Sequence, residues 1–465
     1  MPKPKPPVQP GERITLPITG QSHTGDGVGK YKGFTVFVPL TIAGEQVAAR
    51  VSRVKKTYAH ARLEEVLQVS PHRVDPLCPV FAQCGGCQLQ HIAYPAQLES
   101  KRRQVVDAFA RIGGLEEVTI LPVLGMEEPW SYRNKAQVPV GGGKGKVEAG
   151  FYAAGSHQII PFDRCLIQQP ENDRTIQQVK EWIRELDIPP YDEKKHRGCL
   201  RHVMVRTGIH TQEVMVVLVT NGPELPHRKQ LVASLRERVP GLTSLIQNIQ
   251  PHRTNVVLGK ESRVLWGEPV IHDRIGHVRF AISPHSFFQV NPVQTEVLYE
   301  QVRRMAALTG EEIIIDAYCG IGTIGLYLAK EAARVLGVES IPQAVEDARH
   351  NAELNGIDHA SFEAGPAEEV MPRWAREGIR PDVMIVDPPR KGCAPELLDA
   401  AVRMSPDRLV YVSCNPATLA RDAAYLKERG YTNCQVQPVD MFPHTSHVEC
   451  VTVFRREWGD GEAGE

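Results

Sequence analysis

The sequence lacks the features that mark membrane-spanning, secreted and fibrous proteins. Its 465 residues contain no apolar run of the roughly 18–20 residues that a membrane span needs. The most apolar stretch, residues 313–329, is interrupted by Asp316 and three glycines. The first ten residues, MPKPKPPVQP, have no apolar core, so we expect no secretory signal. With 42% hydrophobic and 23% charged residues, the composition is typical of a folded globular protein.

Aromatic residues and net charge are also scarce. Aromatics make up 6% of the chain, and 54 Lys+Arg against 55 Asp+Glu leave a formal net charge of −1, which excludes a global attraction to nucleic acid. The charge is unevenly spread, because residues 1–66 hold ten basic and five acidic side chains. A basic segment attached to a mildly acidic remainder of the chain is typical of a domain that binds and orients an anionic polymer. A solvated basic surface explains the charge equally well.

Ten cysteines without a secretory signal argue against a disulfide framework and favour a reducing compartment, so we expect a cytoplasmic protein. Cys78, Cys84 and Cys87 fall within ten residues of one another. A metal or cluster bound there needs a fourth soft ligand, for which Cys165 is the best candidate. Zinc and a [4Fe–4S] cluster both accept four thiolates, and the spacing alone does not choose between them.

The first seventy residues have the pattern of a small β-barrel. Short runs rich in β-branched residues, such as 34–39 and 45–54, are separated by glycine-rich turns. Four or five short strands within residues 11–70 suit a barrel of the OB type, a common platform for nucleic acid. From about residue 126 to 280, strands and helices mix in an α+β pattern.

From about residue 290 the pattern changes to alternating strands and helices. The predicted strands 312–316, 334–339, 382–387 and 408–413 are each followed by a helix or a turn into one. Repeated βα units predict a mainly parallel sheet with helices on both faces. The predicted fold class is therefore α/β, with a Rossmann-like domain at the C-terminal end of the chain.

The first strand–helix junction of this region carries a glycine-rich motif, DAYCGIGTIG at residues 316–325. Its glycines allow a ligand to approach the backbone and the helix N-terminus, and Glu339 ends the next strand, where it can bind ribose hydroxyls. By its glycine spacing alone, the motif matches the fingerprint of dinucleotide-binding proteins. Two acids favour S-adenosylmethionine instead: Asp316 lies before the first glycine, and Asp387 opens a rigid turn at another strand end.

Two further positions are candidates for chemistry. Cys414 follows the strand 408–413 and precedes a helix, so it lies in the ligand crevice, and we expect the helix N-terminus to lower its thiol pKa. This position favours a nucleophile over a buried core cysteine. Glu449 lies near the start of the apolar strand 448–454. A carboxylate is unexpected in a buried strand, because burying its charge is costly. Glu449 is a candidate general base, with a solvent-facing strand end as the alternative.

A third candidate segment, SPHSFFQVNP at residues 283–292, precedes the predicted sheet. Its two aromatic side chains beside the amides of Gln289 and Asn291 suit stacking on, and edge recognition of, a base or an adenine. A structural lid is the alternative interpretation.

Together these motifs resemble the RNA uracil-5-methyltransferase family that carries an N-terminal TRAM domain and an iron–sulfur cluster, of the bacterial 23S rRNA type. The resemblance runs from the cysteine cluster through SFFQVN, DAYCGIG, DPPRKG and SCNP to HTSHVE. It implies a TRAM barrel at residues 8–70, a central α+β domain with the cluster at 71–285, and a class I methyltransferase domain at 286–457. The helix within about 93–124 is expected to pack on the catalytic domain.

The resemblance also implies roles for individual residues. Cys414 is the expected nucleophile and Glu449 the expected base. The expected contacts to S-adenosylmethionine are Gln289, Tyr318, Glu339 and Asp387, and the expected ligands of the [4Fe–4S] cluster are Cys78, Cys84, Cys87 and Cys165. Tyr318 departs from the family pattern, since many relatives carry Phe there, and Thr323 stands where some carry Asn.

The chemistry accounts for these residue types independently. Uracil C5 is a poor nucleophile, and addition of a thiolate at C6 makes an enolate that attacks a methyl group from C5. A base must then remove the C5 proton before the thiolate leaves. A uridine inside folded RNA must also be flipped out of its stack.

We therefore expect methylation of C5 of a uridine in RNA, with 23S rRNA as substrate, S-adenosylmethionine as cofactor, and no DNA or membrane partner, by a monomer. The alternatives are a tRNA uracil-5-methyltransferase and an RNA cytosine-5-methyltransferase. An NAD-dependent oxidoreductase would leave Cys414, the cysteine cluster and the basic barrel without roles. A non-catalytic RNA-binding iron–sulfur protein would tolerate the loss of Cys414.

Overall fold

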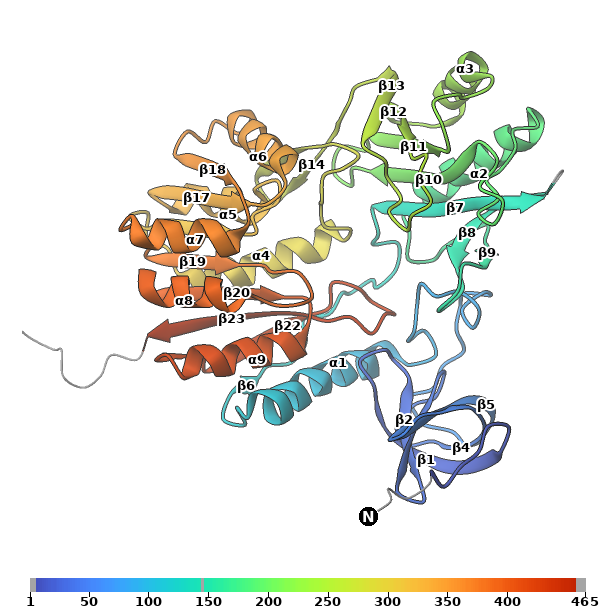
Figure 1. The fold of residues 1–465 in the computed structure, drawn as a ribbon, viewed down its shortest axis with the longest axis horizontal. Helices are drawn as coiled ribbons and strands as arrows, with labels where there is room; N and C mark the ends of the chain where they lie inside the picture. Colours follow the sequence, from blue (N-terminus) through green and yellow to red (C-terminus); the bar gives the residue numbers. More distant parts are fainter. Residues whose placement is uncertain (1–5, 144–145, 457–465) are drawn as a thin grey trace, which may run out of the picture.

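The computed structural model describes residues 6–143 and 146–456 (Figure 1). Its first five strands close into a barrel, because alternate residues of each strand point inward; in the first strand these are Ile14, Leu16 and Ile18, all buried. The predicted small β-barrel is confirmed. In order around the barrel, the strands are β1 (Arg13–Gln21), β2 (Gly27–Tyr31), β3 (Phe34–Val38), β5 (Tyr58–Gln68) and β4 (Gln46–Val54).

The central part of the chain forms a mixed sheet of seven strands. Helix α2 (Pro170–Glu185) covers it and buries Ile176, Val179 and Trp182 in the core beneath; a second helix is α3 (Arg228–Arg238). In spatial order, the strands are β13 (Glu261–Gly267), β12 (Leu242–Ile249), β11 (Val214–Thr220), β10 (Leu200–Thr207), β7 (Lys135–Gly143), β8 (Lys146–Tyr152) and β9 (Ile159–Pro161).

The C-terminal part forms the larger sheet, here called the catalytic sheet. Strands β16 to β20 along its path are parallel. Of these, β16, β19 and β20 are largely apolar and buried, as strands covered on both faces are, whereas β18 at the end of the order is only partly buried. In spatial order, the strands are β18 (Ala360–Ala364), β17 (Arg334–Glu339), β16 (Ile313–Ala317), β19 (Val383–Val386), β20 (Arg408–Ser413), β23 (Glu449–Arg456), β22 (Gln435–Val439) and β6 (Thr119–Ile120), with β21 (Tyr431–Thr432) beside β23.

Helices cover both faces of the catalytic sheet, which confirms the methyltransferase-type α/β fold (Figure 1). Ile314 faces one core layer and Ile315 the other. The strand order reverses between β16 and β19, so the carboxyl ends of these strands open a crevice at this switch point. The helices are α4 (Pro292–Ala306), α5 (Thr323–Leu328), α6 (Pro342–Leu354), α7 (Ala367–Arg376), α8 (Pro395–Met404) and α9 (Pro416–Lys427).

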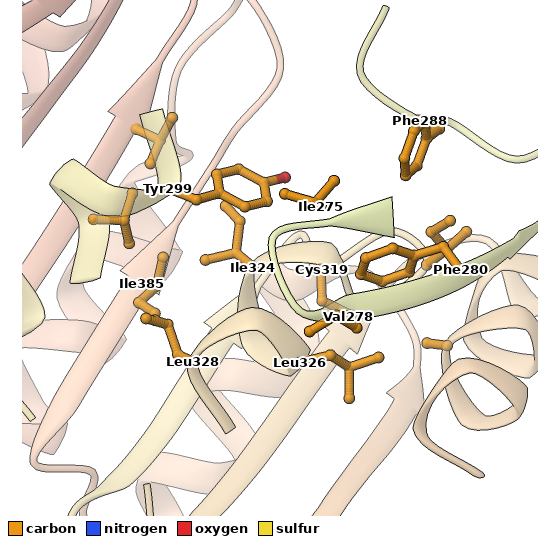
Figure 2. Close-up of a cluster of buried hydrophobic side chains, with 14 of the residues drawn as sticks. Ile275, Val278, Phe280, Phe288, Tyr299, Cys319, Ile324, Leu326, Leu328 and Ile385 are labelled. Carbon is orange, nitrogen blue, oxygen red and sulfur yellow. The ribbon is translucent and has the colours of Figure 1, made fainter. Parts of the chain in front are cut away.

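A hairpin of β14 (Ile271–Ile275) and β15 (Val278–Ile282) packs on one of these faces. Figure 2 shows Ile275 and Phe280 of this hairpin next to Ile324 and Leu326 of α5. The hairpin therefore lies against the catalytic sheet although it precedes residue 286. The predicted domain boundaries stay predictions.

Helix α1 (Tyr94–Ala108), continued by a π-helical segment (Phe109–Gly113), lies against the other face (Figure 1). It ends at Gly114, whose φ of +63° is left-handed. Val105 and Phe109 are buried in the same core layer as Leu419 and Ala420 of α9. The helix expected within about 93–124 thus contacts the catalytic sheet. In the part of the chain that the structure describes, no helix is both long and apolar enough to span a membrane.

Candidate active site

The turn between β16 and α5 forms the floor of the crevice. Tyr318 has a φ of +66°, which costs a non-glycine residue about 1–3 kcal/mol and is typical of functional sites. Asp316 Oδ2 accepts a hydrogen bond of 2.8 Å from the Gly325 amide and fastens the turn to the first turn of the helix. A Cβ atom on Gly325 would lie 3.0 Å from that oxygen, which explains the glycine.

Glu339 ends the neighbouring strand β17 and reaches back to the same turn. Its Oε2 accepts from the Gly320 amide at 3.1 Å, and its Oε1 accepts from the Ser340 hydroxyl and the Ile341 amide, each at 2.9 Å. These bonds hold the carboxylate at the strand end, where a pair of ribose hydroxyls could be bound. Tyr318 lies on the same turn, with its ring packed partly against the α8 side of the sheet.

Three carboxyl groups meet at this edge. Burial, together with the charges of Asp387 and Glu339, raises the pKa of Asp316 to about 7. Loss of solvation also raises the pKa of Asp387 to about 7. One oxygen of Asp316, Oδ1, is buried without a hydrogen-bond partner. This excess of negative charge favours a cationic ligand, and the methionyl ammonium and sulfonium groups of S-adenosylmethionine meet that requirement.

Gln289 lies on a segment that links the two sheets. Its backbone carbonyl accepts from Asn134 Nδ2 at 3.2 Å, and the Val290 carbonyl accepts from the Asn134 amide at 2.8 Å. The prediction that both neighbouring aromatics stack on a ligand is wrong for Phe288, which is buried against Phe280 (Figure 2). Phe287 is 71% exposed and remains free to stack.

Cys414 and Glu449 are brought together by strand pairing. Strand β23 runs antiparallel to β20 with Ser413 opposite Cys450, so the next pair in register is Cys414 and Glu449. Burial raises the pKa of Glu449 to about 8, and the charge of Asp387 adds to the effect while Arg390 opposes it. The candidate base is therefore largely a neutral acid at pH 7.

The expected lowering of the Cys414 pKa is wrong. Burial, together with the negative charges of Glu449 and Asp387, raises the pKa of the thiol to about 11. Arg390 is the cation that lowers it. The two carboxyl groups and the loss of solvent thus outweigh the helix N-terminus in the protein without ligands.

Cys414 opens into a cavity of about 630 Å³ that three parts of the chain enclose. Arg390, Asn415 and His447 line it from the catalytic sheet, with Asn415 Nδ2 donating to the Arg390 carbonyl at 2.9 Å. The barrel turn at residues 23–26 lines it from one side, and residues of the segment 81–88 line it from another. The cavity is large enough for one nucleotide next to the edge of the sheet where the carboxyl groups of Asp316, Asp387 and Glu339 lie.

Comparison with known proteins agrees with this geometry. Residues 266–457 match the family model described as tRNA (Uracil-5-)-methyltransferase, and residues 7–63 match the TRAM domain. RNA methyltransferases of Halalkalibacterium halodurans and Clostridium tetani are 53% and 49% identical to this chain, covering 98% of it in each case and 99% and 98% of their own lengths. The structure of Pyrococcus abyssi tRNA (uracil-54, C5)-methyltransferase in complex with S-adenosyl-L-homocysteine superposes with a TM-score of 0.76 at 32% identity, covering 95% of this chain and 100% of its own.

The chain belongs to the RNA uracil-5-methyltransferase family. It is an S-adenosylmethionine-dependent enzyme that acts on RNA, as expected. The family favours uracil over the cytosine-5 alternative, and it gives Cys414 and the basic barrel roles that a nicotinamide-dependent enzyme would not.

The four cysteines of this uracil-5-methyltransferase share a second cavity, of about 410 Å³. Burial raises the pKa of the Cys87 and Cys165 thiols to about 12. In the described ranges, no three His, Cys, Asp or Glu side chains are arranged closely enough to hold a metal ion. The cavity is lined by Cys78, Cys84, Cys87 and Cys165 together with the basic side chains of Arg133, Lys135 and Arg164. Burial, with the charges of Arg206 and Arg133, lowers the pKa of Lys135 to about 7.

Several residues that shape the site were not singled out from the sequence. Asn134 is one, because a single amide just before a strand carries no signal of the loop that it holds. Lys101 is another: it lies on α1 among charged residues and is typical of a solvated face, yet it is fully buried against Asp440. The sequence contains no signal for a pair 339 positions apart.

The raised pKa of Cys414 predicts slow alkylation of this thiol at pH 7. Because only the thiolate reacts, the rate with iodoacetamide should rise about tenfold per pH unit between pH 7 and 9. Arg390→Met removes the cation that favours the thiolate and should slow alkylation at each of these pH values. The rate is measured by mass spectrometry of the peptide that contains Cys414.

Lys391→Met is the matched control, since Lys391 lies beside Arg390 but pairs with Glu368 on the surface. A rate at pH 7 equal to that of an ordinary thiol, or an equal effect of the two variants, would contradict the electrostatic account.

Proposed function

We propose that this enzyme methylates C5 of a uridine in 23S rRNA through a covalent bond between Cys414 Sγ and C6 of the base. The observation that carries the proposal is the pairing of β20 with β23, which sets a thiol beside a carboxyl group at the edge that suits S-adenosylmethionine. The motif order that resembles the 23S rRNA type supports this substrate. The likeness to the Pyrococcus abyssi enzyme supports a uridine of tRNA as the second candidate.

Cys414 acts first. The thiol loses its proton to solvent, the resulting thiolate Sγ forms a bond to C6, and the electrons of the C5–C6 double bond move toward O4 of the base. S-adenosylmethionine supplies a methyl group on a sulfonium, which the electron-rich C5 accepts. Arg390 supports the first step, because its positive charge favours the thiolate over the thiol.

Glu449 acts last. Its carboxylate takes the proton from C5, the electron pair of that C–H bond re-forms the C5–C6 double bond, and the bond between C6 and Sγ breaks. A pKa of about 8 makes the ionised form a minority at pH 7 and the majority above pH 8. Release of the methylated base should therefore become faster as the pH rises through this range.

We further propose that Cys78, Cys84, Cys87 and Cys165 hold a [4Fe–4S] cluster. The chemistry of the donor set supports this, since four thiols line one cavity and such clusters take four thiolates. The cations Arg133 and Arg164 in the same wall would offset the negative charge of a thiolate-bound cluster. The reaction has no redox step, so the proposed role is structural.

We also propose a cellular compartment, an oligomeric state and an RNA-contacting surface for the enzyme. All ten cysteines are free thiols, which supports a reducing cytoplasm. The proposal also includes that the enzyme acts as a monomer. The barrel turn at residues 23–26 borders the 630 Å³ cavity, so the barrel, with the surplus of basic residues in its segment, is proposed to contact the RNA backbone.

The covalent bond is testable with RNA that contains 5-fluorouridine. Fluorine cannot leave C5 as a proton does, so the enzyme should stay bound to this RNA through Cys414 after methyl transfer. We expect a protein–RNA complex that withstands denaturing electrophoresis and forms only with S-adenosylmethionine. Cys414→Ala should form none, whereas Cys434→Ala, which changes an exposed thiol, should match wild type. Turnover by Cys414→Ala would refute the role.

Glu449→Gln tests the last step. This variant should attack ordinary uridine and transfer the methyl group once, then remain attached, because nothing removes the C5 proton. The expected result is an accumulated protein–RNA complex with one equivalent of S-adenosylhomocysteine per enzyme. Glu428→Gln at the end of α9 serves as the control. Multiple turnovers at near wild-type rate, or no complex at all, would show that Glu449 is not the base.

The cluster is tested by metal analysis. Protein purified without oxygen should be brown and contain about four irons per chain. Cys165→Ala should lower the iron content sharply, and Cys199→Ala, which alters a half-buried thiol outside the cavity, should not. Stoichiometric zinc without iron would contradict the assignment.

A further inference from the structure

Helix α1 presents a polar stripe to the C-terminal half of the chain. Tyr94, Gln97 and Lys101 recur at the three- and four-residue spacing that places side chains on one helix face. The stripe faces residues 440–448, here called the catalytic loop, which connects β22 to β23 and ends at Glu449.

The first contact is a fully buried ion pair. Lys101 Nζ lies 2.5 Å from Asp440 Oδ1, and both side chains have an exposed fraction of 0%. Lys101 Nζ also donates to the Phe442 carbonyl at 3.1 Å, and the Tyr94 hydroxyl donates to Asp440 Oδ2 at 3.0 Å. The start of the catalytic loop is therefore held by two side chains of α1.

The second contact is at His444. Gln97 Oε1 accepts from the His444 amide at 3.0 Å, and Gln97 Nε2 lies 3.2 Å from His444 Nδ1. The His444 carbonyl accepts from the amides of Gln88 and Leu89, and its ring stacks on Trp130 with centroids 3.8 Å apart. His444 has a φ of +66°, so these bonds stabilise a backbone conformation that is unfavourable on its own.

These contacts lie behind the active site rather than in it. Ser446, His447 and Val448 of the catalytic loop line the 630 Å³ cavity, whereas the side chains of the α1 stripe do not. Burying two charges costs free energy that a well-packed apolar pair would not. Apolar side chains alone would suffice to pack a helix on a sheet. A buried ion pair on the loop that leads directly into Glu449 therefore indicates a role beyond packing.

We propose that Lys101 and Gln97 are positioning residues for the uracil-5-methyltransferase reaction: by fixing the catalytic loop at Asp440 and His444, they hold the Glu449 carboxyl group beside Cys414. The inference rests on the proposed role of Glu449 as the base. Displacing a reacting group by about 1 Å can cost about a hundredfold in rate. Loosening the catalytic loop should therefore slow the release step and leave the binding of RNA and cofactor intact.

Lys101→Met tests this inference in the full-length enzyme. We expect kcat to fall about 10–100-fold with KM for RNA and for S-adenosylmethionine within about twofold of wild type. The covalent protein–RNA complex should accumulate on ordinary RNA, as for a defect in removal of the C5 proton. Lys427→Met is the matched control, because the Lys427–Glu117 pair also joins the N-terminal half to the catalytic sheet but is exposed.

A double variant separates positioning from stability. Lys101→Met alone leaves Asp440 buried without its cation and should lower the midpoint of thermal unfolding. Lys101→Met with Asp440→Leu removes both charges and should recover much of that midpoint, but it does not restore the anchor, so kcat should stay low. Recovery of kcat together with the midpoint would show a purely structural role and overturn the inference.

Gln97→Leu covers the case in which Lys101→Met does not fold. It removes the bonds to His444 without leaving a buried charge, and it should show the same fall in kcat and the same accumulated complex. A folded Gln97→Leu enzyme with wild-type kcat would overturn the inference. Failure of the proposed function is visible separately, since wild-type enzyme would then form no complex with 5-fluorouridine RNA.

Discussion

The buried pair of Lys101 and Asp440 is the constraint on which the order of the active site depends. It joins two residues 339 positions apart in a region that water does not reach, where an unpaired charge is strongly destabilising. Helix α1 and the loop before Glu449 therefore cannot separate without exposing a charge to solvent or leaving it buried without its partner. Apolar contacts of Val105 and Phe109 pack the helix on the catalytic sheet, and the ion pair fixes the helix to this loop.

A second constraint is electrostatic. Asp316, Asp387 and Glu449 lie at one edge, where burial raises the pKa of each, and the charge of Asp387 contributes to the shifts of Asp316 and Glu449. Burial, together with the charges of Glu449 and Asp387, keeps Cys414 protonated at pH 7. Any cation bound at this edge offsets the carboxylates and lowers the thiol pKa. Cofactor binding and activation of the nucleophile are thus coupled through charge, with Arg390 as the permanent cation nearest the thiol.

Much of the fold follows from local sequence patterns. The barrel follows from alternating residues and glycine turns, and the catalytic sheet from its apolar strands and intervening helices, because both patterns depend on neighbours in the chain. Glu339 and Asp387 could be placed at one edge, since parallel strands share the direction of their carboxyl ends.

Other features depend on which distant segments meet. The pairing of Cys414 with Glu449 requires that β23 insert antiparallel between β20 and β22, which no local pattern encodes. The direction of the Cys414 pKa shift depends on carboxyl groups from other strands and could not be read from its helix alone. Phe288 is core rather than a stacking platform because the β14–β15 hairpin packs beside it.

The most direct test of the central claim is a map of 5-methyluridine in ribosomal and transfer RNA from cells that lack this protein. The account predicts that one or more 5-methyluridines of 23S rRNA are missing, that wild-type protein restores them, and that Cys414→Ala does not. A loss confined to tRNA would select the second candidate substrate. An unchanged map of 5-methyluridine in both RNAs would contradict the account.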